Sequence, residues 1–136
     1  MRSPLVLGDG GQFRQQPGWQ VATLTGVTTD KSTWVTLLTE GQPLTIPDQS
    51  AWLFNARVLA SGVSGTGGFE LDGVVKRVGS VTLVGSKDNT IASDSNSLKV
   101  RVVEDSGNDA LAIQVKGINN AEIQWSAVMM ITSIPG

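Results

Sequence analysis

The sequence predicts an all-β domain, built as an antiparallel β-sandwich or jelly-roll-like fold. Short segments alternate apolar and polar residues with a period of two. Turn residues separate these segments at intervals of about 8–12 residues. No segment shows the period of an amphipathic helix. This spacing favours an antiparallel sandwich over a parallel sheet, and we expect about nine or ten short strands.

Composition narrows the possible functions. The chain of 136 residues contains neither cysteine nor histidine, which excludes disulfides, most hydrolase triads and nearly all zinc sites. We therefore expect no cofactor, no metal and no catalytic residue. The net charge of −2 is too balanced to attract a nucleic-acid backbone. No apolar run approaches the ~18 residues of a membrane span, so neither nucleic acid nor membrane insertion is expected.

We divide the chain into an amino-terminal arm or linker (1–19) and a β-sandwich domain (20–136). The arm includes a short strand around 12–16, unless it is an unstructured lead-in. The predicted strands of the domain are 20–28, 33–39, 44–46, 50–60, 69–78, 81–84, 90–92, 98–103, 110–116 and one within 119–134. Each alternates in polarity or is rich in Thr and Val, and each is bounded by turn residues.

Two strands define the expected core. From Trp52 to Ala60 every second residue is apolar, and these residues include Phe54. In the last strand Trp125 shares a face with apolar neighbours, so both tryptophans are expected to be buried. The glycine-rich segment 61–68 is predicted to be a flexible hairpin tip, because no helix follows it to form a phosphate loop. Gly73, inside a strand, predicts a bulge or a close backbone approach.

The last strand changes character along its length. After Ala127 its alternation stops, and Val128, Met129, Met130 and Ile131 make both faces apolar. A strand of this kind needs a second surface over its far end. That surface is either another sheet or another subunit.

Six segments, in their order and spacing, resemble the carboxy-terminal β domain of tail fibres and tailspikes of tailed bacteriophages. They are Ser50–Ala60, Phe69–Arg77, Leu83–Ser86, Leu98–Val100, Leu111–Gly117 and Ile123–Ala127. The resemblance implies a homotrimeric virion domain in the phage tail, outside the cell, with other phage tail proteins as partners. It also implies attachment to a bacterial surface glycan or an outer-membrane receptor. The family provides no catalytic motif to transfer, so we expect that the protein is not an enzyme. Two alternatives stay open, a purely structural trimerisation cap and a glycan-degrading tailspike module.

This interpretation assigns candidate residues. Val128, Met129, Met130 and Ile131 are predicted to form the trimer interface. Trp19 and Trp34 are possible sugar platforms, although an interface or core role is the alternative for both. Recognition is expected in the loops at 61–68, 86–97 and 104–109, because the tips of a rigid sandwich tolerate variation.

An acidic residue pair and an acidic segment are the two candidate sites of chemistry in the sequence. Glu70 and Asp72 share a strand face and resemble a glycosidase pair, but residues two apart on a strand lie only ~7 Å apart, and a sugar must sit between the two groups. The segment 105–109 carries oxygen ligands suited to calcium but lacks the full loop pattern. We therefore expect an ordinary solvated pair and an ordinary turn.

Overall fold

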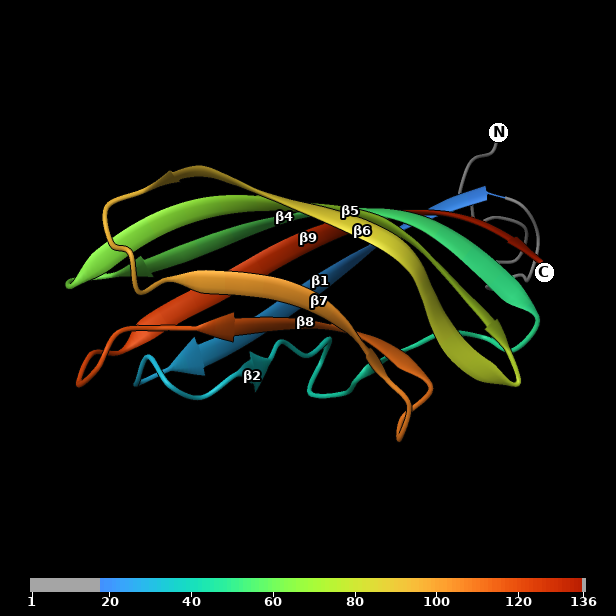
Figure 1. The fold of residues 1–136 in the computed structure, drawn as a ribbon, viewed down its shortest axis with the longest axis horizontal. Helices are drawn as coiled ribbons and strands as arrows, with labels where there is room; N and C mark the ends of the chain where they lie inside the picture. The colour runs from blue at the N-terminus through green and yellow to red at the C-terminus, as the bar shows by residue number, and fades with distance from the viewer. Residues whose placement is uncertain (1–17, 136) are drawn as a thin grey trace.

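The computed structural model describes residues 18–135, which form two facing antiparallel sheets and no helix (Figure 1). The fold class predicted from the sequence is therefore confirmed. The larger sheet has the strand order β1-β9-β4-β5-β6, with bounds Gly18–Thr28, Ile123–Pro135, Ser50–Gly62, Gly65–Val78 and Ser80–Ser93. In the smaller sheet β8 (Ala110–Lys116) pairs with β7 (Lys99–Asp105), β2 (Val35–Thr36) and β3 (Leu44–Thr45).

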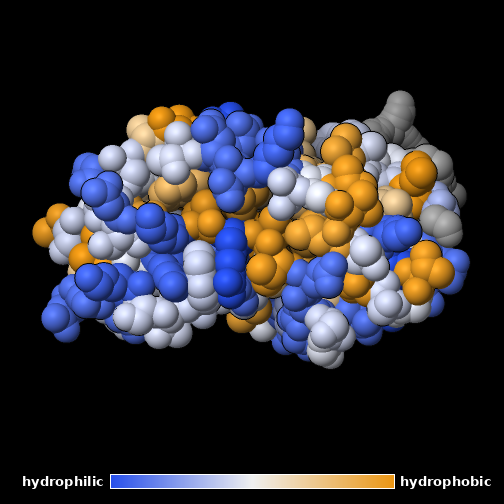
Figure 2. All heavy atoms as spheres, in the orientation of Figure 1, coloured by the Kyte–Doolittle hydropathy of each residue, from blue (hydrophilic) through white to orange (hydrophobic). Residues whose placement is uncertain are grey.

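The two sheets are joined at both edges. On one side, the backbones of Thr25 in β1 and Leu38 exchange two hydrogen bonds of 2.9 and 3.0 Å. On the other side, the Leu83 backbone N–H of β6 donates to the Glu104 carboxylate of β7, at 2.6 Å. Figure 2 shows apolar side chains gathered between the layers in the middle and right of the view, and a mainly hydrophilic left end.

The core lies between the sheets, and β9 supplies its centre. Every second residue from Ile123 to Ile131 is buried. Trp125 stacks on Phe69 with 6.2 Å between ring centroids, and its indole N–H donates to Thr28 Oγ1 at 2.8 Å. Trp52 is also buried, so both predicted core tryptophans are confirmed. The indole hydrogen bond removes the cost of burying that polar group.

The segment 61–68 contains a hairpin tip, as predicted, but most of it is strand and not a flexible loop. Strand β4 runs to Gly62 and β5 begins at Gly65, so only Val63 and Ser64 form the tip. The glycines serve close packing. A Cβ on Gly65 would lie 2.7 Å from the Ile118 Cδ1 atom, and one on Gly67 would lie 3.1 Å from the Phe69 Cζ atom.

The predicted loop at 86–97 is also largely strand. Strand β6 continues to Ser93 and pairs with β5 as far as Gly67. Residues 84–94 are all exposed, because β6 is an edge strand whose two faces are both uncovered there. Without a buried face, the segment has no alternating pattern to mark it as a strand.

The proposed arm falls mostly outside the described residues. The expected short strand at 12–16 lies there entirely. Gly18 and Trp19, which the sequence-based division assigns to the arm, pair with Ser133 and Thr132 and so begin β1. The division at residue 19 otherwise stays a prediction.

Gly73 confirms the expected close backbone approach. It lies opposite Phe54 in the β4–β5 pair, and a Cβ there would be 2.5 Å from Phe54 Cζ and 2.7 Å from the Gly85 carbonyl oxygen. Gly73→Ala is therefore expected to lower the free energy of unfolding by about 1–3 kcal/mol, since the core must shift to fit one methyl group. Urea unfolding measures this loss.

Gly85→Ala is the matched control, because a Cβ at Gly85 would meet nothing within 4 Å. Its effect should stay within about 0.5 kcal/mol. Equal losses of unfolding free energy in the two variants would show that the contact with Phe54 does not restrict the size of the side chain at position 73.

Candidate functional site

The outer face of the larger sheet is unusually apolar. An antiparallel sheet with one face in the core normally turns polar side chains to water on the other. Here apolar side chains recur across four neighbouring strands on the outer face. They are Trp19, Val21, Leu53, Leu59, Val74, Val128, Met130 and Ile134, each at least 39% exposed. An exposed apolar area that neighbouring strands share marks an interaction surface.

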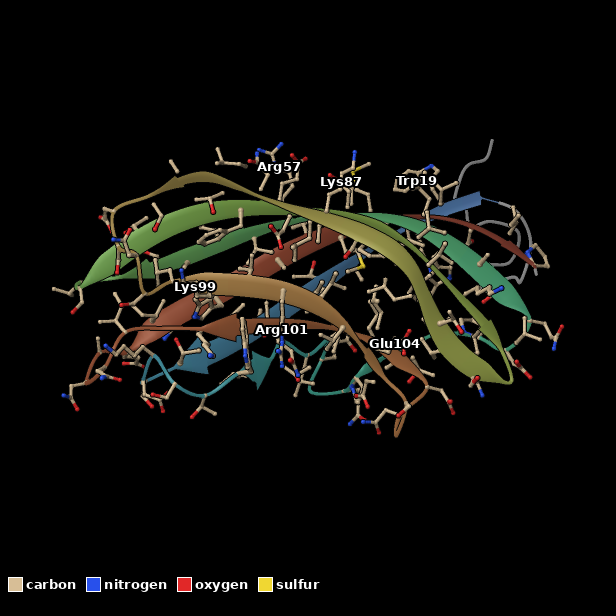
Figure 3. The ribbon with its side chains drawn as sticks, viewed as in Figure 1. Trp19, Arg57, Lys87, Lys99, Arg101 and Glu104 are labelled. Atoms are coloured by element: carbon tan, nitrogen blue, oxygen red, sulfur yellow. The ribbon has the colours of Figure 1, made fainter. Side chains whose placement is uncertain are left out.

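A charged cluster lies within this apolar face. Asn55 Nδ2 donates to Glu70 Oε2 at 3.0 Å and to Asp72 Oδ1 at 2.5 Å. Arg57 lies opposite Glu70 in the register, and Lys87 lies opposite Asp72. Neither cation forms an ion pair within residues 18–135. Trp19, Arg57 and Lys87 all project from the same side of the larger sheet (Figure 3).

Glu70 and Asp72 do share a strand face, as predicted. The Asn55 amide occupies the space between them, because one nitrogen contacts both carboxylates. In a glycosidase the two carboxyl groups flank the scissile bond, with the substrate between them. Within a single chain, the pair is therefore arranged to hold Asn55.

The four predicted interface residues divide between two faces. Val128 and Met130 point outward, with 45% and 54% of their surface exposed. Met129 and Ile131 point into the chain's own core, at 0% and 1%. The sequence pattern alone does not reveal that the smaller sheet covers this end of β9, so all four residues were predicted to face a partner. The trimer interface itself stays a prediction, and Val128 and Met130 are the members open to a partner.

The two candidate sugar platforms lie in different surroundings. Trp19 is 57% exposed at the start of β1 and belongs to the apolar outer face. Trp34 precedes β2 and is half-buried beneath two cations. The Arg101 Cζ atom lies 4.1 Å from the indole centroid, and the Lys116 Nζ atom lies 4.6 Å from it.

The cations at Trp34 belong to a cluster on the outer face of the smaller sheet, which we call the basic cluster: Trp34, Lys99, Arg101 and Lys116. Arg101 Nε donates to Gln114 Oε1 at 2.8 Å, and Gln114 Nε2 donates to Thr36 Oγ1 at 3.1 Å. Lys99 and Lys116 are direct cross-strand partners. In Figure 3, Lys99 and Arg101 lie on β7, in the sheet opposite Trp19 and Arg57.

Asp30 is an acidic group near the basic cluster, and it is engaged elsewhere. Its Oδ1 atom accepts hydrogen bonds from the backbone N–H groups of Thr33 at 2.8 Å and Ser32 at 2.9 Å. These bonds, the one from Thr33 foremost, hold the pKa of Asp30 below its ordinary value, and the Lys116 charge adds a smaller effect. Within the described chain, Asp30 and Lys116 form no ion pair.

Sequence reasoning missed the basic cluster. It treated Lys99 and Arg101 as outward charges and did not connect them with Trp34. Their proximity depends on the pairing of β7 and β2 with β8, which brings residues 34–36 beside 114–116. The only local signal is the alternation of Lys99 and Arg101 with valines.

In the remaining predicted recognition segment, 104–109, the first two residues end β7 and residues 106–109 form a tight turn to β8. Asn108 donates to the Asp105 carboxylate through its backbone N–H at 3.3 Å and through its Nδ2 atom at 2.8 Å. In the part of the chain that the structure describes, no group of three or more His, Cys, Asp or Glu residues is placed to hold a metal ion. The same part contains no helix long and apolar enough to cross a membrane.

No protein-family model and no curated protein matches the sequence. The chain is similar to a solved structure, the tailspike protein gp49 from Acinetobacter baumannii bacteriophage Fri1, described as a capsular polysaccharide depolymerase. The TM-score is 0.46 and the identity 14%, over 86% of this chain and 17% of gp49.

The expectation that this protein is not an enzyme is contradicted, because the similar solved structure is described as a depolymerase. That expectation rests on the absence of histidine and cysteine and on the lack of a transferable motif. Those absences do not bear on carboxylate chemistry, which glycosidases use. The depolymerase activity is stated of gp49, and this chain spans about a sixth of that protein's length.

Proposed function

We propose that this chain is a domain of a phage tail fibre or tailspike that assembles as a homotrimer and helps attach the virion to the bacterial surface. The observation that carries the proposal is the apolar outer face of the larger sheet. Its exposed apolar members come from β1, β9, β4 and β5, which are neighbouring strands of one sheet. Exposure of such a face to water is unfavourable in free energy, and association with a partner removes that exposure.

Copies of the same chain are the partners that suit this face. It carries both signs of charge, with Arg57 and Lys87 beside Glu70 and Asp72. Neither cation has an ion-pair partner within residues 18–135. A second copy brings the opposite charges to the same apolar surroundings, and charge complementarity then fixes the orientation of the subunits. The three-fold stoichiometry follows from the resemblance to phage tail fibres.

Substitution of Met130 tests this interface. Met130 lies beside Val21 and Asn55 in the register, and its side chain points away from the core. Met130→Lys is therefore expected to leave the single chain folded but to abolish the trimer, because assembly would bury an unpaired charge. Sedimentation velocity measures the assembly state, and circular dichroism reports the fold.

Val63→Lys is the control, since Val63 is fully exposed at the β4–β5 tip and lies off this face. Val128→Lys is a second interface variant, to be used if Met130→Lys does not fold. Trimers of normal stability in both interface variants would exclude the outer face as the contact surface.

Attachment is tested by competition. The purified chain at saturating concentration is expected to bind host cells and to block adsorption of the phage that carries it. If the chain trimerises but neither binds cells nor blocks adsorption, the attachment role is wrong and the alternative of a purely structural trimerisation cap stands. Assay of the host polysaccharide for shortening, in the same incubation, measures whether this chain has the activity described for gp49.

A further inference from the structure

The basic cluster on the smaller sheet has the features of a binding site for an anion. Lys99 and Lys116 face each other directly across β7 and β8. Like charges in this position destabilise a sheet. Arg101, two residue pairs further along, adds a third positive charge on the same face. None of the three forms an ion pair within residues 18–135, although the net charge of the chain is negative.

The cluster is also held in place before any ligand binds. Trp34 lies against the Arg101 guanidinium and the Lys116 ammonium, which restricts both side chains by cation–π contact. Arg101 uses only Nε for Gln114, and Gln114 is fixed in turn by Thr36. Within residues 18–135 the two terminal nitrogens of Arg101 donate to no other group, so they can form the paired hydrogen bonds that a carboxylate accepts.

The surroundings favour a saccharide as the carrier of that carboxylate. Lys99 is exposed, and Arg101, Lys116 and Trp34 are partly exposed, so the groups form a shallow surface and not an enclosed site. Gln114 and Thr36 lie beside the cations and offer amide and hydroxyl groups of the kind that bind sugar hydroxyls. The ring of Trp34 is already contacted by cations, so its role is to support them and not to stack a sugar.

We infer that the basic cluster binds a carboxylated sugar of an acidic surface polysaccharide, with the carboxylate paired to Arg101 and Lys116. This inference rests on the proposed function, because it takes the ligand to be a bacterial glycan. It assigns recognition to the face of the smaller sheet opposite the apolar outer face. It also differs from the sequence-based expectation, which placed recognition in hairpin loops.

Titration calorimetry of the full chain tests the inference. The probes are oligomers of galacturonate, guluronate, hyaluronate and sialate, with the carboxyl-reduced oligomer of each as the neutral control. At least one acidic oligomer should bind, its reduced form should not, and added salt should weaken the affinity. Failure of all acidic oligomers, or equal affinity for a reduced form, would overturn the inference. Equal binding of single-stranded oligonucleotides would overturn it as well.

Variants locate the site. Arg101→Gln and Lys116→Gln should each raise the Kd about tenfold or more, since each removes a charge-assisted hydrogen bond. Arg101→Lys keeps the charge but not the planar fork, and should recover only part of that affinity. Lys76→Gln makes the same charge change on the larger sheet and should leave the Kd unchanged. Equal effects of Lys76→Gln and Arg101→Gln would show that only net charge matters, which contradicts the inference.

The adsorption assay separates the two proposals. If Arg101→Gln and Lys116→Gln still compete for adsorption as well as the parent chain, the attachment role stands and the basic cluster is not the binding site. If the parent chain binds an acidic oligomer through Arg101 but never competes for adsorption, the site stands and the attachment role fails.

Discussion

Burial of one face of β9 between two sheets is the constraint on which the rest of the structure depends. Ile123, Trp125 and Met129 on that face are all buried. Because side chains alternate along a strand, their burial forces Val128 and Met130 to the outside. The neighbours β1 and β4 pair with β9 along nearly its whole length, so their outer residues fall into rows with those of β9. The apolar outer face is therefore set by the same register that builds the core.

The hydrogen bond between Trp125 and Thr28 fixes that register from inside. The indole fills the space between the sheets and stacks on Phe69, which contributes most through burial of apolar surface. Its N–H has a partner only if β1 and β9 are aligned so that Thr28 lies near Trp125. A slip by one residue would turn the buried side chains outward and leave the indole N–H unpaired.

The sequence predicted the strands well wherever one face of a strand is buried. Alternation around Trp52 and Trp125 identified β4 and β9, and the core role of both tryptophans is confirmed. It failed at Gly65 and Gly67, whose lack of a side chain reads as flexibility but serves close packing. It also predicted loops within β6 beyond Val84, where neither face of the strand is buried to give it a pattern. The residues of the basic cluster could not be predicted together, because the contact of Trp34 with Arg101 and Lys116 depends on strand pairing that no local pattern encodes.

The two proposals place assembly and recognition on opposite sheets, so both can act at once. Assembly through the outer face of the larger sheet is the central claim, and native mass spectrometry of the purified chain at micromolar concentration tests it most directly. The expected result is a complex of three times the 14.3 kDa chain mass. A stable monomer of 14.3 kDa under those conditions would contradict it.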